Sequence, residues 1–300
     1  MDDATRREID KASWKALREA GIFQPPVRIE TLLAHLRLYR EFYDLEDPGF
    51  LDRAKHRIRI HGRRLVDILR KVRLAAVLLY DDRRIVVDLK LPSIKRDFPS
   101  FHEVAHRIFV WHRPFFYGDT AQTLDPDWHE QLEAEANYGA SSLMFCGPVF
   151  TREALDTTAK WLSIVALKKR YGKSYVTTLR RYVEHTHDHS MAMLVSTPHW
   201  EGKPSDQAER WRHFVGSKRF AAEFASVTAS DVLEAVDGNC VQCRGGLVAD
   251  FTYCLKDENG DLHEFHAESF YNRHYILTLF VEVRRLGTNP IVVPQSVNRS

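Results

Sequence analysis

Residues 98–112 read Phe-Pro-Ser-Phe-His-Glu-Val-Ala-His-Arg-Ile-Phe-Val-Trp-His, and the interpretation of the whole chain starts from them. Pro99 and Ser100 can begin an α-helix, Pro114 can end it, and the residues between contain no Gly or Pro. The stretch is therefore predicted to be helical. Its apolar residues, which give the helix a buried side, are Val104, Ala105, Ile108, Phe109 and Trp111.

Within this stretch, His102-Glu103-Val104-Ala105-His106 has the H-E-x-x-H pattern that occurs in zinc sites. Residues four apart on an α-helix lie on nearly the same face, so His102 and His106 can present two imidazoles to one Zn²⁺. Glu103 lies beside them and can act as a base. Because the chain has 15 His residues, chance H-x-x-x-H pairs are common, and a third ligand is needed to support a zinc site.

Two residues are candidates for the third ligand. His112 has the spacing of the long H-E-x-x-H-x-x-G-x-x-H pattern, but Phe109 stands where that pattern has its Gly. On an unbroken helix His112 lies about 280° around the axis from His102, against about 40° for His106, so it is predicted to point elsewhere. Glu133 lies in a second predicted helix, rich in Ala and Glu. Two His and one Glu form a ligand set of catalytic zinc sites.

The chain resembles the ImmA/IrrE-type metallopeptidases, which combine an H-E-x-x-H helix with a later helix reading E-x-x-A-N-x-x-A, then Leu, Met and Pro. Here the later signature runs from Glu133 to Ala140 and is followed by Leu143-Met144 and Pro148. Gly139 departs from it, standing where an aromatic-Ala pair is usual. The resemblance covers about residues 25–198 and implies that Glu133 is the third metal ligand.

The expected fold class is α+β. A zincin-like metallopeptidase domain with a small sheet is predicted over residues 1–198, including a helical extension at about 152–185. Residues 199–227 are expected to be a connector, and residues 228–300 a small β-rich C-terminal module, in which Asn259-Gly260 is a hairpin signal.

The resemblance implies an enzyme, a zinc-dependent intracellular endopeptidase, with Zn²⁺ on His102, His106 and Glu133. Glu103 would take a proton from the attacking water and pass it to the leaving amine. Members of the family often cleave or control a repressor-type DNA-binding protein, so such a protein is the expected substrate. The alternative is a non-catalytic regulator that keeps the fold and binds protein or DNA. The group that supports the oxyanion is left open among Tyr117, His112 and His129.

The overall composition gives no reason to expect a nucleic-acid or membrane partner. The net charge is +2, from 43 Lys and Arg against 41 Asp and Glu. The charged N-terminus lacks the apolar run of a secretory signal, and the longest aliphatic stretch, Leu74–Tyr80, is too short to span a bilayer. In a chain without a secretory signal, the four Cys residues are expected to be reduced thiols of a cytoplasmic protein. The oligomeric state is left open.

Two segments could in principle contact nucleic acid, but each has a simpler interpretation. Residues 53–73 are basic and interrupted by apolar residues, which is typical of the solvated face of an amphipathic helix. Residues 152–184 could form two helices spaced as a helix-turn-helix, but a structural role is favoured. Direct binding of nucleic acid is therefore not expected.

Two further features bear on ligands. Residues 74–89 are predicted to form a hairpin, whose edge strand could hold an extended peptide substrate by main-chain hydrogen bonds. Cys240 and Cys243, with Cys254 and His263 or His266, could hold a second metal. Because only one well-spaced Cys pair is present, small buried thiols are the favoured interpretation.

Overall fold

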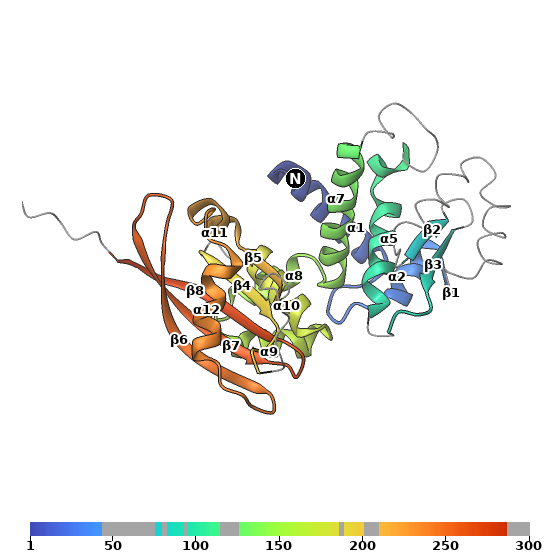
Figure 1. Cartoon of the computed structure of the whole chain (residues 1–300). Coiled ribbons are helices and arrows are strands. Elements are labelled where there is room, and N and C mark those ends of the chain that lie inside the picture. Colours follow the sequence, from blue (N-terminus) through green and yellow to red (C-terminus); the bar gives the residue numbers. More distant parts are fainter. Residues whose placement is uncertain are drawn as a thin grey trace, which may run out of the picture. The chain divides into compact units, whose positions relative to one another are not determined.

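The computed structural model describes residues 1–43, 76–79, 83–92, 95–114, 126–185, 189–200 and 210–286. The described chain is α+β, as predicted, and it divides into two compact units, Met1–Arg152 and Glu153–Ser300 (Figure 1). Within the described residues the first unit contains a three-stranded sheet and the second a five-stranded sheet.

The helices of the first unit form a packed group beside its sheet. Their bounds are α1 Asp3–Glu19, α2 Ile29–Leu36, α5 Asp97–Ile108, the 3₁₀ turn η2 Val110–His112, and α7 Pro126–Met144. α5 packs along α7, and α1 is joined to α7 because Tyr138 and Ser142 both donate hydrogen bonds to Asp10. α8, Pro148–Leu155, follows and crosses into the second unit.

The predicted hairpin is present in the sheet of the first unit. β2 (Ala76–Leu79) pairs antiparallel with β3 (Arg84–Asp88), whose other edge pairs in parallel with β1 (Tyr39–Tyr43). β3 is central and buries Ile85, Val86 and Val87, while β2 lies at one edge of the described strands and packs against α5. The predicted basic segment 53–73 lies outside the described residues.

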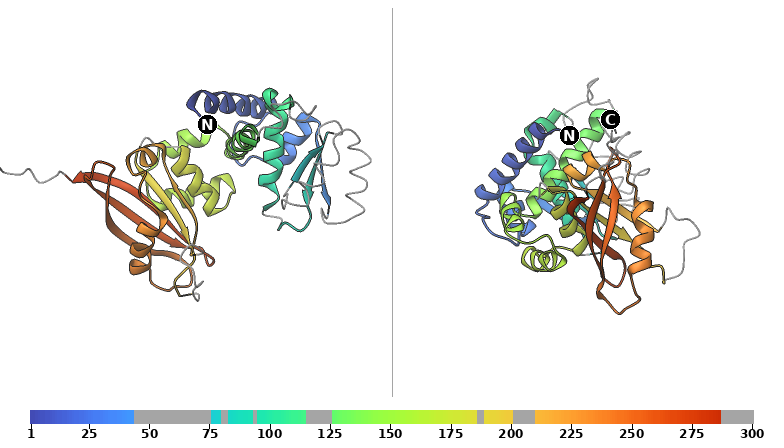
Figure 2. Two further views of the ribbon diagram at one scale, coloured as in Figure 1. Left: turned by 45° about the horizontal axis from the view of Figure 1, so that its top comes forward. Right: turned by 90° about the vertical axis from the view of Figure 1, so that its left-hand side faces the viewer.

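The second unit is built on an antiparallel sheet with strand order β5-β4-β8-β7-β6. The strands are β4 Met191–Ser196, β5 Trp211–Gly216, β6 Gly246–Lys256, β7 Leu262–Tyr271 and β8 Ile276–Leu286. The helices are α9 Trp161–Tyr171, α10 Tyr175–His185, α11 Lys218–Glu223 and α12 Ala229–Asn239. Figure 2 shows α12, in orange, lying along this sheet.

The sheet of the second unit is covered on both faces. Apolar side chains of α12 pack with Phe265 and Ala267 of β7 in one core. Trp161 of α9 stacks on Phe270, which points to the opposite face because side chains alternate along a strand. α10 packs on β4 and β5 and buries Arg181, which favours the structural interpretation of residues 152–184.

The two units divide the chain at residues 152 and 153 and not at the predicted 198/199 boundary. The predicted connector, 199–227, contains β5 and α11, which pack with β4. β4 in turn pairs with β8 near the end of the described chain. These long-range strand pairings join the predicted helical extension and the predicted C-terminal module into one unit.

Candidate metal centre

α5 and α7 bring the side chains of His102, His106 and Glu133 together. The two Nε2 atoms lie 3.1 Å apart, His102 Nε2 lies 3.2 Å from Glu133 Oε2, and His106 Nε2 lies 3.5 Å from Glu133 Oε1. A tetrahedral ion with bonds of about 2.0–2.1 Å separates neighbouring ligand atoms by about 3.3–3.4 Å. Within the described chain, these residues are the one group of three His, Cys, Asp or Glu side chains close enough to hold a metal ion.

Close packing of α5 against α7 makes this grouping possible. α5 places His102 and His106 one turn apart on the same face. Gly139 of α7 faces α5 so closely that a Cβ atom there would lie 2.4 Å from Phe109 Cζ and 3.1 Å from Ala105 Cβ. The absence of a side chain at Gly139 therefore lets the two helices approach, which brings Glu133 within reach of both imidazoles.

The outer ring nitrogens of both histidines have hydrogen-bond partners. His102 Nδ1 lies 3.0 Å from Asn137 Oδ1, so Nδ1 donates and the Nε2 lone pair faces the other ligands. His106 Nδ1 lies 2.8 Å from His112 Nδ1, and His112 Nε2 lies 3.1 Å from Glu135 Oε2. The hydrogen bonds of the two Nδ1 atoms fix the orientation of the rings. Metal-binding histidines in proteins are usually oriented in this way.

His112 does not point away as predicted. The prediction assumed an unbroken helix, but α5 ends at Ile108, Phe109 is extended, and η2 turns the chain back. His112 is consequently buried against the far side of His106 and does not join the group of three ligand atoms. Sequence reasoning did not single out Glu135 or Asn137 as site residues. Asn137 could have been found because it lies four residues after Glu133 and shares its side of α7.

The electrostatics of the group favour positive charge at its centre. Burial opposes a charge on His102, but the close contact with Glu133 and the charges of Glu103 and Glu133 together raise its pKa. Burial also opposes the charge on Glu133, but the close imidazoles of His102 and His106 hold its pKa well below the usual range. Burial lowers the pKa of His106 to about 4, so that ring is neutral. The donors present therefore fit a divalent cation, which binds neutral imidazole and carboxylate.

Glu103 lies beside this group and accepts a hydrogen bond from the backbone of β2. Its side chain is 9% exposed, and burial raises its pKa to about 7. The charge of His102 opposes this rise, the charge of Glu133 adds to it, and a hydrogen bond from the backbone N–H of Leu78 opposes it. A carboxyl group with a pKa near neutrality can both accept and return a proton.

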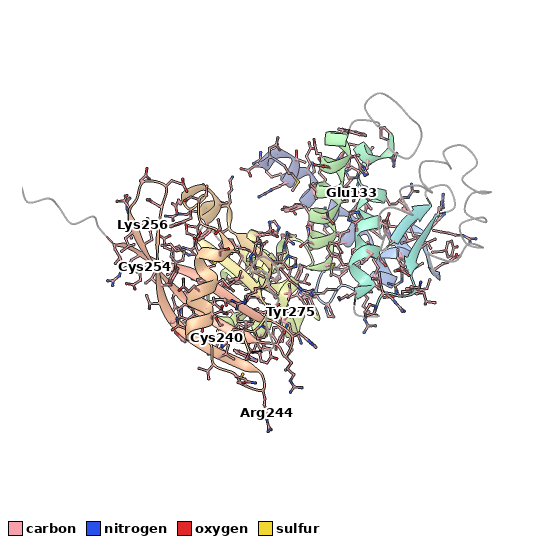
Figure 3. The ribbon with its side chains drawn as sticks, viewed as in Figure 1. Glu133, Cys240, Arg244, Cys254, Lys256 and Tyr275 are labelled. Atoms are coloured by element: carbon pink, nitrogen blue, oxygen red, sulfur yellow. The ribbon has the colours of Figure 1, made fainter. Side chains whose placement is uncertain are left out.

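The second metal considered from the sequence finds no support. Cys240 ends α12 and is buried, whereas Cys243 and Cys254 are exposed, and Figure 3 shows Cys240 and Cys254 at separate places. None of these thiols belongs to a group that could hold an ion among the described residues. His263 is bound by Glu282 and Asp257, and His266 by Asp250.

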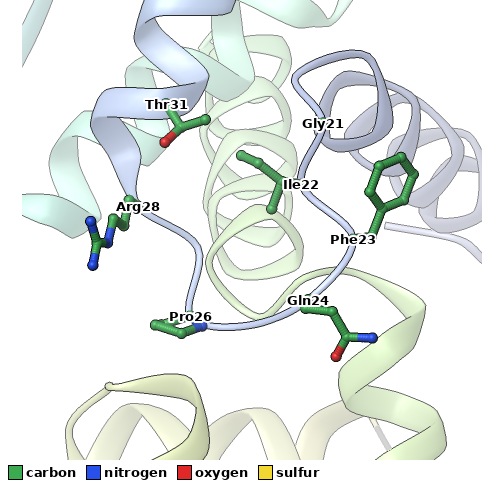
Figure 4. A pocket seen from close by; sticks show the side chains of 7 residues that line it. All are labelled: Gly21, Ile22, Phe23, Gln24, Pro26, Arg28 and Thr31. Carbon is green, nitrogen blue, oxygen red and sulfur yellow. The ribbon is translucent and has the colours of Figure 1, made fainter.

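Of the three oxyanion candidates, Tyr117 lies outside the described residues, His112 contacts His106, and His129 lies one turn before Glu133 in α7. A surface hollow between α1 and α2 contains none of the predicted site residues (Figure 4). It is lined by Gly21, Ile22, Phe23, Gln24, Pro26, Arg28 and Thr31.

No helix of the described chain combines the length and the apolar character that crossing a membrane requires. No family model matches the chain, and no curated protein matches it in sequence. A solved structure named "Mycobacterium tuberculosis transcriptional regulator" is similar to it with a TM-score of 0.52 and 12% sequence identity. The match covers 92% of this chain and 88% of that one. At this identity the likeness concerns the fold alone.

Proposed function

We propose that the protein is an ImmA/IrrE-type zinc endopeptidase whose first unit is a zincin-like domain. His102, His106 and Glu133 would hold one Zn²⁺, and Glu103 would be the general base. The observation that carries the proposal is the convergence of three ligand atoms, 3.1 to 3.5 Å apart, beside a buried carboxyl group.

Zn²⁺ bound by three protein ligands supplies a Lewis acid that lowers the pKa of water and polarises the peptide carbonyl. The side chains around it move the protons. Glu103 would accept a proton from the attacking water and later deliver it to the leaving amine. Burial of Glu103 limits competition from bulk water for this proton.

The edge strand β2 is suited to hold the substrate. The backbone N–H of Leu78 donates to Glu103, so it points away from β3, toward the outer edge of the strand. An extended peptide that adds to this edge by main-chain hydrogen bonds would run past Glu103. This arrangement supports cleavage of an unfolded or loop segment of a protein.

The proposed substrate is an intracellular regulatory protein, specifically a helix-turn-helix repressor. This step rests on the family resemblance. A regulatory setting also agrees with the name of the structurally similar protein, a transcriptional regulator. That name equally favours the second candidate function, a regulator that binds protein or DNA without cleaving it.

Glu103→Gln separates the two functions because it keeps the shape of the side chain and leaves all three ligands intact. The zinc-loaded variant should cleave its target about 10²–10⁴-fold more slowly than the wild type, while retaining its zinc. The matched control is Glu130→Gln, which changes an exposed carboxylate on α7.

The assay should present a peptide library derived from the host proteome and any repressor encoded beside the gene, with mass spectrometry of new N-termini. Equal cleavage by Glu103→Gln and the wild type would remove Glu103 from the mechanism. A regulatory response in cells that survives Glu103→Gln would favour the non-catalytic function.

A further inference from the structure

Behind the proposed metal ligands lies a chain of buried polar side chains that ends at Glu135. Glu135 is 2% exposed and His112 is fully buried. Glu135 Oε2 lies 2.7 Å from Trp111 Nε1 and 3.1 Å from His112 Nε2, and Oε1 lies 2.8 Å from Gln131 Nε2. His112 Nδ1 then lies 2.8 Å from His106 Nδ1.

The donors around Glu135 determine where the protons of this chain lie. The indole N–H of Trp111 and the amide N–H of Gln131 can only donate, so both oxygens of Glu135 act as acceptors. His112 Nε2 must then donate to Glu135. In a neutral imidazole this leaves His112 Nδ1 as an acceptor.

The same reasoning continues to the metal ligand. Because His112 Nδ1 accepts, His106 Nδ1 must carry the proton that lies between the two rings. His106 Nε2 is then unprotonated, and it is this atom that faces His102 Nε2 and Glu133. The carboxylate of Glu135, acting through His112, thus selects the tautomer of His106 that can bind a metal.

Packing fixes the ring planes as well. Phe109 lies edge-on to His112, with ring centroids 5.2 Å apart, and stacks on Trp111 with centroids 5.0 Å apart. The other ligand, His102, is held differently, by the single amide oxygen of Asn137. His106 therefore depends on a longer and more deeply buried set of partners.

We propose that His112 and Glu135 are positioning residues that hold His106 in its metal-binding tautomer and orientation, and so set the affinity of the site for the metal ion. The proposal rests on the metal site proposed above. Partners of this kind typically contribute about 10–100-fold in metal affinity.

The test compares His112→Leu, which removes the acceptor, with His112→Asn, whose amide oxygen can take the position of Nδ1. Zn²⁺ affinity is measured by competition with a chelator, and Co²⁺ is used as a spectroscopic probe of the ligand field. His112→Leu should bind Zn²⁺ about 10–100-fold more weakly and shift the Co²⁺ visible bands. His112→Asn should restore both toward wild-type values.

Glu135→Gln provides a second variant that keeps the side-chain shape, and it should weaken Zn²⁺ binding in the same direction. Glu130→Gln is again the exposed control on α7. Melting temperatures of the metal-free proteins separate a loss of folding from a loss of affinity. In ¹⁵N-labelled, zinc-loaded wild type, the imidazole signals of His112 should show the Nε2–H tautomer.

Zinc binding by wild type together with unchanged affinity in all three variants would overturn this inference while leaving the proposed function intact. A lowered melting temperature without a change in affinity would do the same, because it would show a purely structural role. If His112→Leu loses more zinc than Glu133→Ala does, His112 is itself a metal ligand and the inference is overturned. Absence of zinc from the wild type would overturn the proposed function and this inference together.

Discussion

Histidines that contact carboxylates occur in both units, and they differ in the direction of their ring nitrogens. In the first unit, His102 and His106 turn their Nε2 atoms toward each other and toward Glu133. In the second unit, His263 is 4% exposed and lies between two carboxylates, with Nδ1 2.7 Å from Glu282 and Nε2 3.3 Å from Asp257.

This difference shows what distinguishes a metal site from a structural hydrogen-bonded cluster. The two nitrogens of His263 point at separate carboxylates on opposite sides of the ring, so they do not converge with other ligand atoms on one point. His102 and His106 use their outer nitrogens as donors, which leaves their inner lone pairs converging with a carboxylate on one point. Neighbouring carboxylates are common to both units, and among the described residues only the first unit brings three ligand atoms together on one point.

The sharpest test of the comparison is removal of the converging ligands. His106→Ala and Glu133→Ala should each lose the zinc, expected at about one per chain in the wild type, because two remaining ligands do not hold the ion tightly. Metal analysis after dialysis against a chelator measures the loss. Cys243→Ala is the control from the second unit and should keep full occupancy. Full zinc in both ligand variants would remove the site, and loss from Cys243→Ala alone would move it to the second unit.

The next largest effect is expected from the hydrogen-bonded cluster of His263, Glu282 and Asp257 in the second unit. His263→Leu removes the buried hydrogen-bond partner that Glu282 and Asp257 share, which should lower the free energy of unfolding by about 2 kcal/mol. His266→Leu removes a more exposed histidine from the same strand, whose partner Asp250 is on the surface, and should cost less than about 1 kcal/mol. Denaturant unfolding measures both values. Zinc content should not change, and a loss of zinc from His263→Leu would contradict the division of roles between the units.

The smallest expected effects are changes in stability on replacing one helical glycine in each unit by alanine. The two changes should have opposite signs. At Gly139 a new methyl group meets the buried ring of Phe109, and overpacking should outweigh the gain in helix propensity and destabilise the protein by about 1 kcal/mol. At Gly238 in α12 the methyl group meets open space, so Gly238→Ala should stabilise by about 0.5 kcal/mol.

Thermal unfolding of Gly139→Ala and Gly238→Ala measures these changes. Gly139→Ala should also weaken zinc binding, because Phe109 contacts His112. Equal stabilisation by both substitutions would show that the approach of α5 to α7 is not as tight as the structure has it.

The local features of the candidate site could be predicted from the sequence. The spacing of His102 and His106 places them on one helical face whatever surrounds the helix. The β-branched run that became β2 and β3 predicted a hairpin for the same local reason. Glu133 was reached through the family resemblance, and the structure brings it to the two histidines.

The remaining features could not be predicted locally, because each depends on contacts between residues distant in sequence. The division at residues 152 and 153 follows from pairing of β4 with β8, which no local pattern encodes. The position of His112 depends on the end of α5 at Ile108 and on Glu135 across the helix pair. The sequence determined which atoms could bind a metal ion, and the packing of α5 against α7 determined the direction in which their lone pairs point.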